Sequence, residues 1–215
     1  MKIRNDTTEI IAVRHGETEW NRRGIQQGHL DSTLTARGEI QARLAGRRLA
    51  LEKIDALYCS DIGRACRTAE IIGSEIGLEP VRDEGVRERN LGMIQGMTLD
   101  EFRLRHPEEH ARFISRDPDY AVPGGETVRE RYERSVASVA RISAMNRGRR
   151  IVIVMHGGNI DSLFRHATGF PLDRPRNFSL YNAALNRFLI SGDDWFLQSW
   201  GDISHLLTNG ALDDY

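Results

Sequence analysis

The sequence predicts an α/β fold: a three-layer sandwich with a mainly parallel central sheet, helices on both faces and a helical cap insertion. Short apolar runs, of which residues 151–155 are the clearest, alternate along the chain with longer segments of helical periodicity. The 215 residues are 40% hydrophobic and 28% charged, which is typical of globular proteins. At this length, and without repeats or linkers, we expect residues 1–215 to form a single domain.

The first half of the chain predicts two strand–helix units and a weak third strand. Ser60 and Asp61 are expected to cap the start of the second helix. Gly77 is expected to end it, because glycine readily adopts the left-handed conformation that often follows a helix. The predicted elements are a strand at 9–13, a helix at 35–53, a strand at 56–59, a helix from its cap to 76, and a strand around Val81.

The second half predicts a helical insertion at about residues 99–146, followed by a return to the sheet. A turn-rich interruption from Asp117 to Gly125 divides this insertion, which we expect to form the cap. The remaining elements are a strand at 150–155, a helix at 157–168, and a hairpin of strands at 184–190 and 195–200 around a turn at 191–194.

Charge and apolar content exclude several classes of function. Thirty Lys and Arg against 31 Asp and Glu give a formal net charge of −1, so no overall field attracts nucleic acid or an anionic membrane. The apolar runs are far too short to cross a membrane, and the N-terminus has no apolar signal core. Cys59 and Cys66 do not form a Cys-x-x-Cys pair and are interpreted as reduced thiols. We therefore expect a cytoplasmic protein that binds neither nucleic acid nor membrane.

Charged side chains follow three of the predicted strands. Arg14 and His15 follow the first, Arg64 lies one helical turn after the second, and His156 and Gly157 follow the last parallel strand. Ligands bind at the carboxyl ends of strands in an open parallel sheet, so these residues are expected to converge. Two guanidinium groups favour a tetrahedral oxyanion, and the backbone N–H groups at the start of a helix add to its stabilisation. The sequence therefore predicts a phosphate site.

His15 is the candidate nucleophile of this site. Its neighbours Arg14 and Arg64 disfavour the imidazolium, and a neutral imidazole nitrogen can attack phosphorus in line. The arginines would neutralise charge on the equatorial oxygens of the phosphoryl group. A phosphate monoester is thus the expected substrate.

The leaving alkoxide needs a proton, and Glu88 is the candidate acid. It lies in a loop-like stretch after the third predicted strand. The adjacent Arg87 and Arg89 are expected to lower its pKa, whereas burial and a substrate dianion raise it. We predict that the substrate itself raises the pKa of Glu88 enough for proton donation.

Four sequence motifs occur in a fixed order along the chain. They are Arg14-His15-Gly16-Glu17-Thr18-Glu19-Trp20-Asn21, Ser60-Asp61-x-x-Arg64-Ala65-x-x-Thr68-Ala69-Glu70, Glu88-x-x-x-Gly92-x-x-x-Gly96 and His156-Gly157. Together they resemble the histidine phosphatase superfamily, in its phosphoglycerate-mutase-like branch. The resemblance covers residues 9 to about 205, which is nearly the whole chain.

The resemblance implies a phosphohistidine on His15 and a proton donor at Glu88. Arg14, Arg64 and His156 complete the implied catalytic set. It implies neither a metal nor a cofactor. The residues implied to bind substrate are Arg14, Asn21, Gln27, Gly28, Arg64, Arg89, His156 and Gly157.

Several groups typical of cofactor-dependent mutases are replaced in this chain. Arg89 matches the mutase pattern, but Asn90 and Leu91 follow it where mutases have histidine and tyrosine. Thr98-Leu99 replaces a lysine, the insertion has no Arg-Arg pair, and Gly158 replaces an asparagine. The missing groups would bind the substrate carboxylate and hold a bisphosphate while it reorients. Water is therefore expected to take the phosphoryl group, which favours a phosphatase.

Three other functions remain open from the sequence. A mutase could use the same phosphohistidine, and the scaffold could serve as a non-catalytic module that binds a phosphate ligand. A metallohydrolase is disfavoured, because the arginines would repel a cation and Pro107 places His106 of the His106-Pro-Glu-Glu-His110 pattern at a helix cap. The expected partner is a small phosphorylated metabolite, and we expect a monomer or homodimer.

Overall fold

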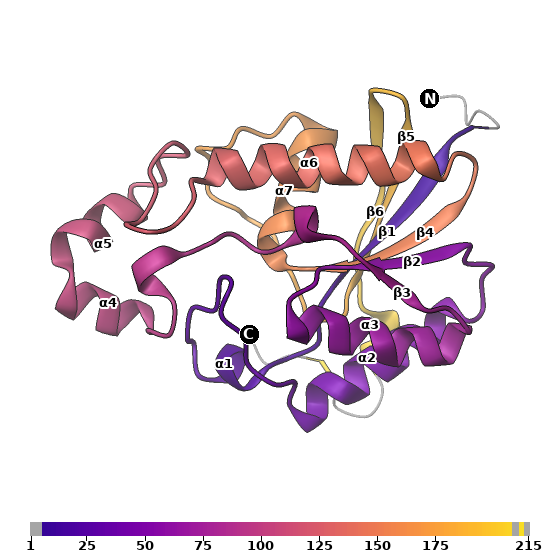
Figure 1. Ribbon diagram of the computed structural model, residues 1–215, viewed down its shortest axis with the longest axis horizontal. Coiled ribbons are helices and arrows are strands. Elements are labelled where there is room, and N and C mark those ends of the chain that lie inside the picture. Colours follow the sequence, from indigo (N-terminus) through magenta and orange to yellow (C-terminus); the bar gives the residue numbers. More distant parts are fainter. Residues whose placement is uncertain (1–5, 208–210, 213–215) are drawn as a thin grey trace.

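The computed structural model describes residues 6–207, 211 and 212, and it contains the predicted sheet (Figure 1). Six strands lie in the order β3-β2-β4-β1-β5-β6. The pairs β3–β2, β2–β4 and β4–β1 are parallel, whereas β1–β5 and β5–β6 are antiparallel. The strands are β1 (Thr8–Arg14), β2 (Ala56–Cys59), β3 (Pro80–Arg82), β4 (Arg150–Met155), β5 (Leu185–Ser191) and β6 (Asp194–Asp202).

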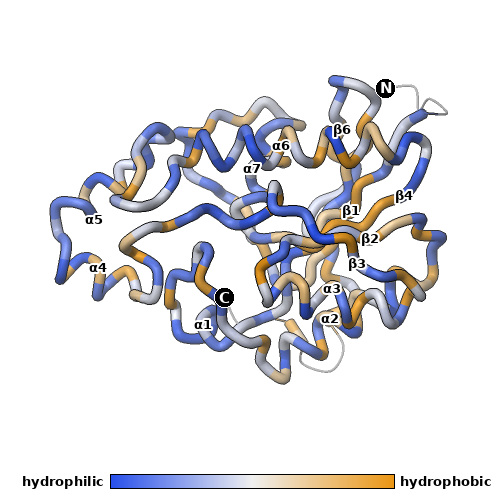
Figure 2. Tube along the Cα trace, in the orientation of Figure 1, coloured by the Kyte–Doolittle hydropathy of each residue, from blue (hydrophilic) through white to orange (hydrophobic). Residues whose placement is uncertain are grey.

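Successive residues of the central strands face opposite sides of the sheet, and each side has its own core. Ile11 and Val13 of β1 pack toward α2 and α3, whereas Ile10 and Ala12 pack toward α6 and α7. Figure 2 shows the apolar residues concentrated on these strands. The mainly parallel three-layer sandwich is thereby confirmed. The covering helices are α2 (Ala36–Leu49), α3 (Gly63–Ile76), α6 (Val128–Met145) and α7 (Gly157–Thr168).

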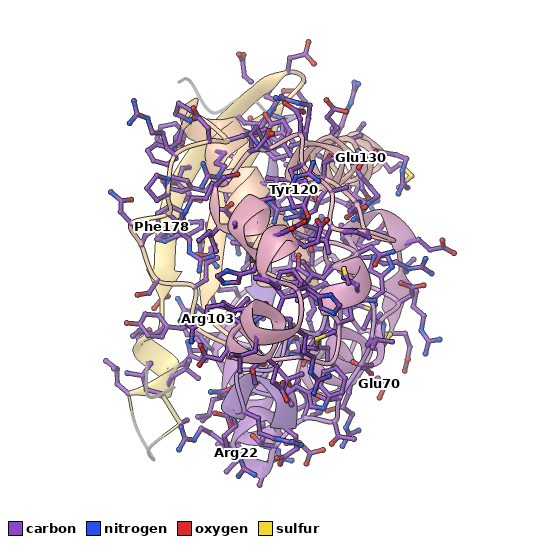
Figure 3. The ribbon with its side chains drawn as sticks, turned by 90° about the vertical axis from the view of Figure 1, so that its left-hand side faces the viewer. Arg22, Glu70, Arg103, Tyr120, Glu130 and Phe178 are labelled. Carbon is purple, nitrogen blue, oxygen red and sulfur yellow. The ribbon has the colours of Figure 1, made fainter. Side chains whose placement is uncertain are left out.

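The helices α4 (Leu99–Arg105) and α5 (Pro107–Ile114) project beyond the sheet as a cap (Figure 1). They enclose a small core of their own, formed by Ile94, Phe102, Tyr120 and Val122. Figure 3 looks at this end of the molecule, where Arg103 of α4 and Tyr120 lie between Arg22 of α1 (Glu19–Arg22) and Glu130 of α6 in the view. The cap helices therefore stand apart from the two cores of the sandwich, on one of which α6 packs.

The start of α3 differs from the prediction. Its N-cap is Ile62, which makes no side-chain cap hydrogen bond, so Ser60 and Asp61 do not cap it. Asp31, from a distant loop, accepts the N–H of Arg64 at 3.1 Å and satisfies one free donor of the first turn. The side chain of Asp61 pairs with Arg87 instead. At the other end, Gly77 closes the helix in the left-handed conformation, with φ 72°, as predicted.

None of the helices that the structure describes combines the length and the apolar character needed to cross a bilayer.

Candidate active site

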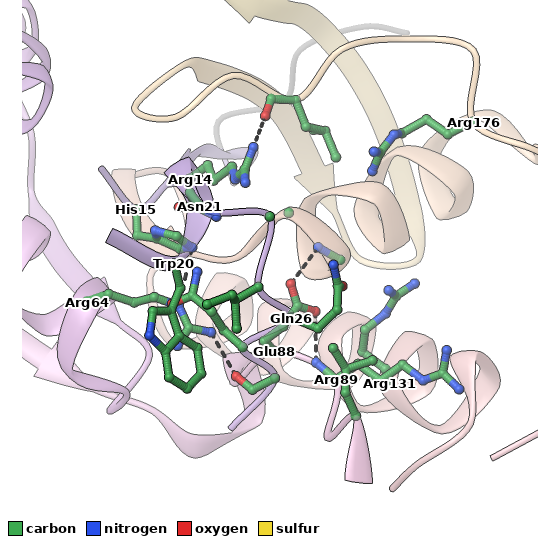
Figure 4. Close-up of a pocket in the computed structure, with 18 of the residues that line it drawn as sticks. Arg14, His15, Trp20, Asn21, Gln26, Arg64, Glu88, Arg89, Arg131 and Arg176 are labelled. Carbon is green, nitrogen blue, oxygen red and sulfur yellow. Dashed lines mark hydrogen bonds between the residues drawn. The ribbon is translucent and has the colours of Figure 1, made fainter. Parts of the chain in front are cut away.

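The site begins where two neighbouring parallel strands end. β1 and β4 are in register, with Arg14 opposite Met155, and the N–H of His15 donates to the Met155 carbonyl at 2.9 Å. His15 directly follows β1 and His156 directly follows β4. Their ring centroids lie 5.3 Å apart. A cavity of about 470 Å³ opens beside His15, whereas the fully buried His156 is not among the residues that line it (Figure 4). We call Arg14, His15, Arg64 and His156 the inner cup.

The ring of His15 is buried and held in one tautomer. Its Nδ1 lies 2.8 Å from the carbonyl oxygen of Gly16, which can only accept, so Nδ1 carries the proton. The lone pair is therefore on Nε2, where the Nε of Arg64 donates at 3.3 Å. Burial, followed by the charges of Arg64 and Arg14, holds the pKa of His15 well below its ordinary value. The ring is therefore neutral in the free protein, which is the state that a nucleophilic role requires.

Arg64 is buried and fixed by backbone carbonyl groups. Its two terminal nitrogens donate to Gly28 O and Leu30 O, each at 2.8 Å, and one of them lies 3.3 Å from an Asp31 oxygen. Gly28 has φ 55°, a conformation that glycine adopts without strain. Asp31 thus positions both the helix turn and the guanidinium of Arg64. No motif or periodicity in the sequence indicates this role of Asp31.

Arg14 and His156 complete the inner cup. Arg14 lines the cavity and donates to the carbonyl of Leu180. The His156 ring is fully buried, and within the described residues neither of its nitrogens has a hydrogen-bond partner. Its pKa is lowered by burial first and then by the charges of Arg64, His15 and Arg14. A neutral His156 can donate one hydrogen bond to an oxyanion.

Glu88 lines the cavity with both oxygens engaged. Its Oε1 accepts the N–H of Arg89 at 2.8 Å, and its Oε2 accepts the N–H of Gly158 at 2.9 Å. Burial raises its pKa, but Arg131, these two N–H groups and Arg64 lower it further, so the net pKa is below the usual value. The expected direction is right, but one cause is wrong, since Arg87 pairs with Asp61 and Arg131 acts in its place.

The remaining predicted binding residues also line the cavity, although several are held by the protein itself. Asn21 forms a capping box with Thr18, and the Gln27 amide donates to the hydroxyl of Thr18 at 2.9 Å. Arg89 donates to the carbonyls of Glu126 and Tyr120 at 2.7 and 3.0 Å, and burial lowers its pKa to about 10. Gln27 and Arg89 thus tie loops around the cavity.

Four further residues form the side of the cavity that faces the cap. We call Leu91, Phe113, Arg131 and Arg176 the outer wall. Sequence reasoning did not find the two arginines. Arg131 did leave a signal, because it heads a buried stripe of α6 that continues at helical spacing through Ser135, Ser138 and Ile142. An arginine on such a stripe is expected to have a specific role.

Comparison with known proteins places the chain in a family. The model of the histidine phosphatase superfamily (branch 1) matches residues 10–203. The chain belongs to this superfamily, whose members include phosphatases and phosphoglycerate mutase-like proteins. It is therefore an enzyme of the histidine phosphatase class.

Individual relatives cover almost the whole chain. Phosphoglycerate mutase-like protein 4 of Arabidopsis thaliana is 42% identical over 211 residues, covering 96% of this chain and 90% of its own. A metal-independent phosphoserine phosphatase of the same plant is 33% identical, covering 99% and 89%. The solved structure of Bacillus stearothermophilus YhfR superimposes with a TM-score of 0.86 at 32% identity, covering 93% of this chain and 99% of that one.

In the described part of the chain, no group of three or more His, Cys, Asp or Glu side chains could hold a metal ion. His106 instead stands at the junction of α4 and α5, with Pro107 in the first turn of α5, as predicted. The rings of His106 and His110 pack on Phe102, with centroids 6.0 and 5.8 Å from it.

Proposed function

We propose that the protein is a metal-independent phosphatase that hydrolyses small phosphate monoesters through a phosphohistidine on His15. One observation carries the proposal: the Nδ1–H of His15 donates to the Gly16 carbonyl, so the lone pair is on Nε2, which accepts from Arg64 in the free protein and can turn to phosphorus once Arg64 donates to a bound phosphate. The substrate that we propose is a phosphorylated metabolite of the cytoplasm.

The first chemical step is transfer of the phosphoryl group to His15. The Nε2 lone pair forms a bond to phosphorus while the bond from phosphorus to the alcohol oxygen breaks. Arg14, Arg64 and His156 stabilise the charge on the equatorial oxygens. Glu88, protonated in the complex, donates its proton to the leaving alkoxide, so that the neutral alcohol departs.

The second step returns the enzyme to its starting state. Water attacks the phosphohistidine, Glu88 takes a proton from that water, and the bond between Nε2 and phosphorus breaks to release orthophosphate. The low pKa of Glu88 in the free protein suits a base, whereas the acid role needs a higher one. A phosphate dianion in the inner cup supplies that rise, because a nearby negative charge disfavours the carboxylate.

The positions that distinguish mutases support hydrolysis. The side chain of Asn90 accepts the N–H of Gly92 at 2.9 Å, so it serves its own loop. Leu91 presents apolar surface to the cavity. The N–H of Gly158 is occupied by Glu88. None of the three holds a second phosphate of a bisphosphate in the way that a mutase cycle requires.

Trapping the intermediate tests the proposal. Acid hydrolyses the P–N bond of phosphohistidine, whereas base preserves it, so a base quench of enzyme with p-nitrophenyl phosphate should retain an adduct on His15. Mass spectrometry of the digested protein would locate it, and His15→Asn should give neither adduct nor orthophosphate. Adduct on another residue, or full turnover by His15→Asn, would contradict the mechanism and favour the non-catalytic module or a different nucleophile.

Product analysis separates the phosphatase from the mutase. With 3-phosphoglycerate as substrate, we expect release of orthophosphate in preference to formation of 2-phosphoglycerate. Predominant 2-phosphoglycerate would assign the mutase activity to the same phosphohistidine.

A further inference from the structure

We propose that Arg131 and Arg176 form a second anion site in the outer wall, which binds a carboxylate or a second phosphate of the substrate. The inference rests on the proposed phosphatase function, since it names the class of phosphate monoester that the site accepts. In the view of Figure 4, both arginines lie on the far side of Glu88 from His15 and Arg64.

Arg131 is buried without adequate partners. It is 7% exposed and lines the cavity, yet its Nε and one terminal nitrogen have no hydrogen-bond partner within the described residues. A buried guanidinium with unsatisfied donors is costly unless an anion completes its hydrogen bonds. Its planar N–H groups match the two oxygens of a carboxylate or phosphate.

Neighbouring carboxylates do not satisfy this guanidinium. Asp161 lies 3.7 Å from Arg131, beyond hydrogen-bond distance, and its nearer oxygen accepts from Arg165 at 2.9 Å. Glu88 influences Arg131 by charge, but both Glu88 oxygens already accept backbone N–H groups. These carboxylates thus leave donors of Arg131 unsatisfied in a side chain that lines the cavity.

Arg176 stands at the mouth of the same cavity. It is exposed, and within the described part of the chain its side chain makes no hydrogen bond or ion pair. It belongs to the loop between α7 and β5, whereas Arg131 belongs to α6. Two arginines from different elements therefore face one space beyond the inner cup.

Charge balance indicates a ligand with more than one anionic group. The lining residues include five arginines, Arg14, Arg64, Arg89, Arg131 and Arg176, and among the described lining residues Glu88 is the one carboxylate. A phosphate monoester carries a charge of about −1.5 to −2, which the two arginines of the inner cup balance. Glu88 and Asp161 lie near the outer arginines, but within the described residues neither carboxylate forms a hydrogen bond with Arg131 or Arg176. A second anionic group on the substrate would compensate these arginines, and the cavity has room for a ligand larger than a phosphoryl group.

Matched substrates isolate the second anion. 3-Phosphoglycerate and glycerol 3-phosphate share a skeleton and differ by a carboxylate against a hydroxymethyl group. Fructose 1,6-bisphosphate and fructose 6-phosphate differ by a second phosphate. For each pair we would measure the ratio of kcat/KM values by orthophosphate release, because a ratio cancels effects on the common chemistry. The ratio of Kd values in a His15→Ala background, measured by calorimetry, gives a second readout that needs no turnover.

Single variants then test the two arginines. We expect Arg176→Gln to reduce the preference for the anionic member of a pair by about tenfold, as expected for one lost charge-assisted hydrogen bond. Arg131→Gln should reduce it further, and Arg131→Lys should restore part of it. Arg174→Gln is the matched control, since Arg174 lies two residues away and does not line the cavity. It should leave both ratios unchanged.

The outcomes separate the two proposals. Loss of preference in the first pair assigns a carboxylate, and loss in the second pair assigns a phosphate. Equal losses for both members of each pair, or the same change in Arg174→Gln, would overturn the second anion site while leaving the phosphatase intact. Selective binding by a wild-type protein that releases no orthophosphate would overturn the phosphatase and retain the site.

Discussion

The inner cup and the outer wall are built in different ways, although they share one cavity. His15 and His156 are placed by the register of two adjacent parallel strands, and Arg64 by the first turn of α3. Leu91 and Phe113 belong to segments that also pack into the small core of the cap. The inner cup thus depends on the rigid sheet, whereas the outer wall depends on how the cap and loops dock. In our proposals, the chemistry takes place in the first region and the second region selects the substrate.

Removing the acid should have the largest effect. We expect Glu88→Gln to lower kcat for alkyl phosphates on the order of 10³-fold, because the alkoxide would leave without a proton. The rate of the first step with p-nitrophenyl phosphate, measured as a burst of p-nitrophenol, should fall much less, because this leaving group needs no proton. Glu84→Gln, in the same segment but exposed at the surface, is the control.

The pH profile gives a further test of Glu88. The acid must carry its proton, so wild-type kcat should fall as pH rises through the pKa of Glu88 in the substrate complex. In the free protein the pKa of Glu88 is lowered. Bound substrate dianion is expected to raise this pKa, so the fall in kcat should occur at a higher pH than the pKa of the free protein. A fall of the same size in Glu88→Gln would assign it to another group.

A conservative substitution in the inner cup should reduce activity less than removal of the acid. Arg64→Lys keeps the charge but cannot reproduce the guanidinium bonds to Gly28 and Leu30, so we expect kcat/KM to fall on the order of 10²-fold. Steady-state kinetics with p-nitrophenyl phosphate would measure this fall in kcat/KM. Arg67→Lys, one turn further along α3 and paired with Glu39, should retain full activity. Similar losses in both would indicate a general effect on the helix.

The boundary between the two regions can be disturbed at Gly158. A Cβ there would overlap an oxygen of Glu88 and a terminal nitrogen of Arg131. We expect Gly158→Ala to lower kcat about tenfold, because both groups must move. Gly157→Ala, whose Cβ would come no nearer than 3.6 Å to Arg14, should lose much less. Thermal melting would show whether the fold is intact, and equal activity of the two variants would contradict the packing.

The smallest effect is expected in the outer wall. Phe113→Ala removes a side chain that lines the cavity and packs against the cap core. KM for 3-phosphoglycerate should rise roughly threefold with little change in kcat, as expected for lost apolar contact outside the reacting groups. Ile114→Ala, at the exposed next position, should leave KM unchanged. A large loss of kcat in Phe113→Ala would give the cap a role in the chemistry.

The sequence predicted the inner cup more fully than its supports. His15 and His156 directly follow buried strands, Arg64 lies at the start of the helix after another strand, and a local apolar run fixes where each strand ends. Asp31 supports Arg64 through a loop whose path depends on tertiary contacts. This dependence also explains the error at the α3 cap, where a distant carboxylate replaced the local Ser60 and Asp61.

The outer wall was harder to predict for a related reason. A helical pattern places Arg131 on the buried stripe of α6, but it does not say whether the first turn of α6 reaches the sheet edge or the cap. Arg176 lies in a loop with no periodic pattern at all. The partner of Arg87 was likewise decided by packing, which brought Asp61 within reach and left Glu88 to Arg131.

The position of β4 in the sheet has a consequence for synthesis on the ribosome. β4 lies between β2 and β1, although it follows both by a long stretch of sequence. A nascent chain that has emerged only as far as α6 has His15 and Arg64 but lacks the strand that joins their halves of the sheet. Such a chain should not bind to an affinity resin that carries a phosphate analogue. Binding to the resin should appear abruptly once the segment through α7 has cleared the exit tunnel.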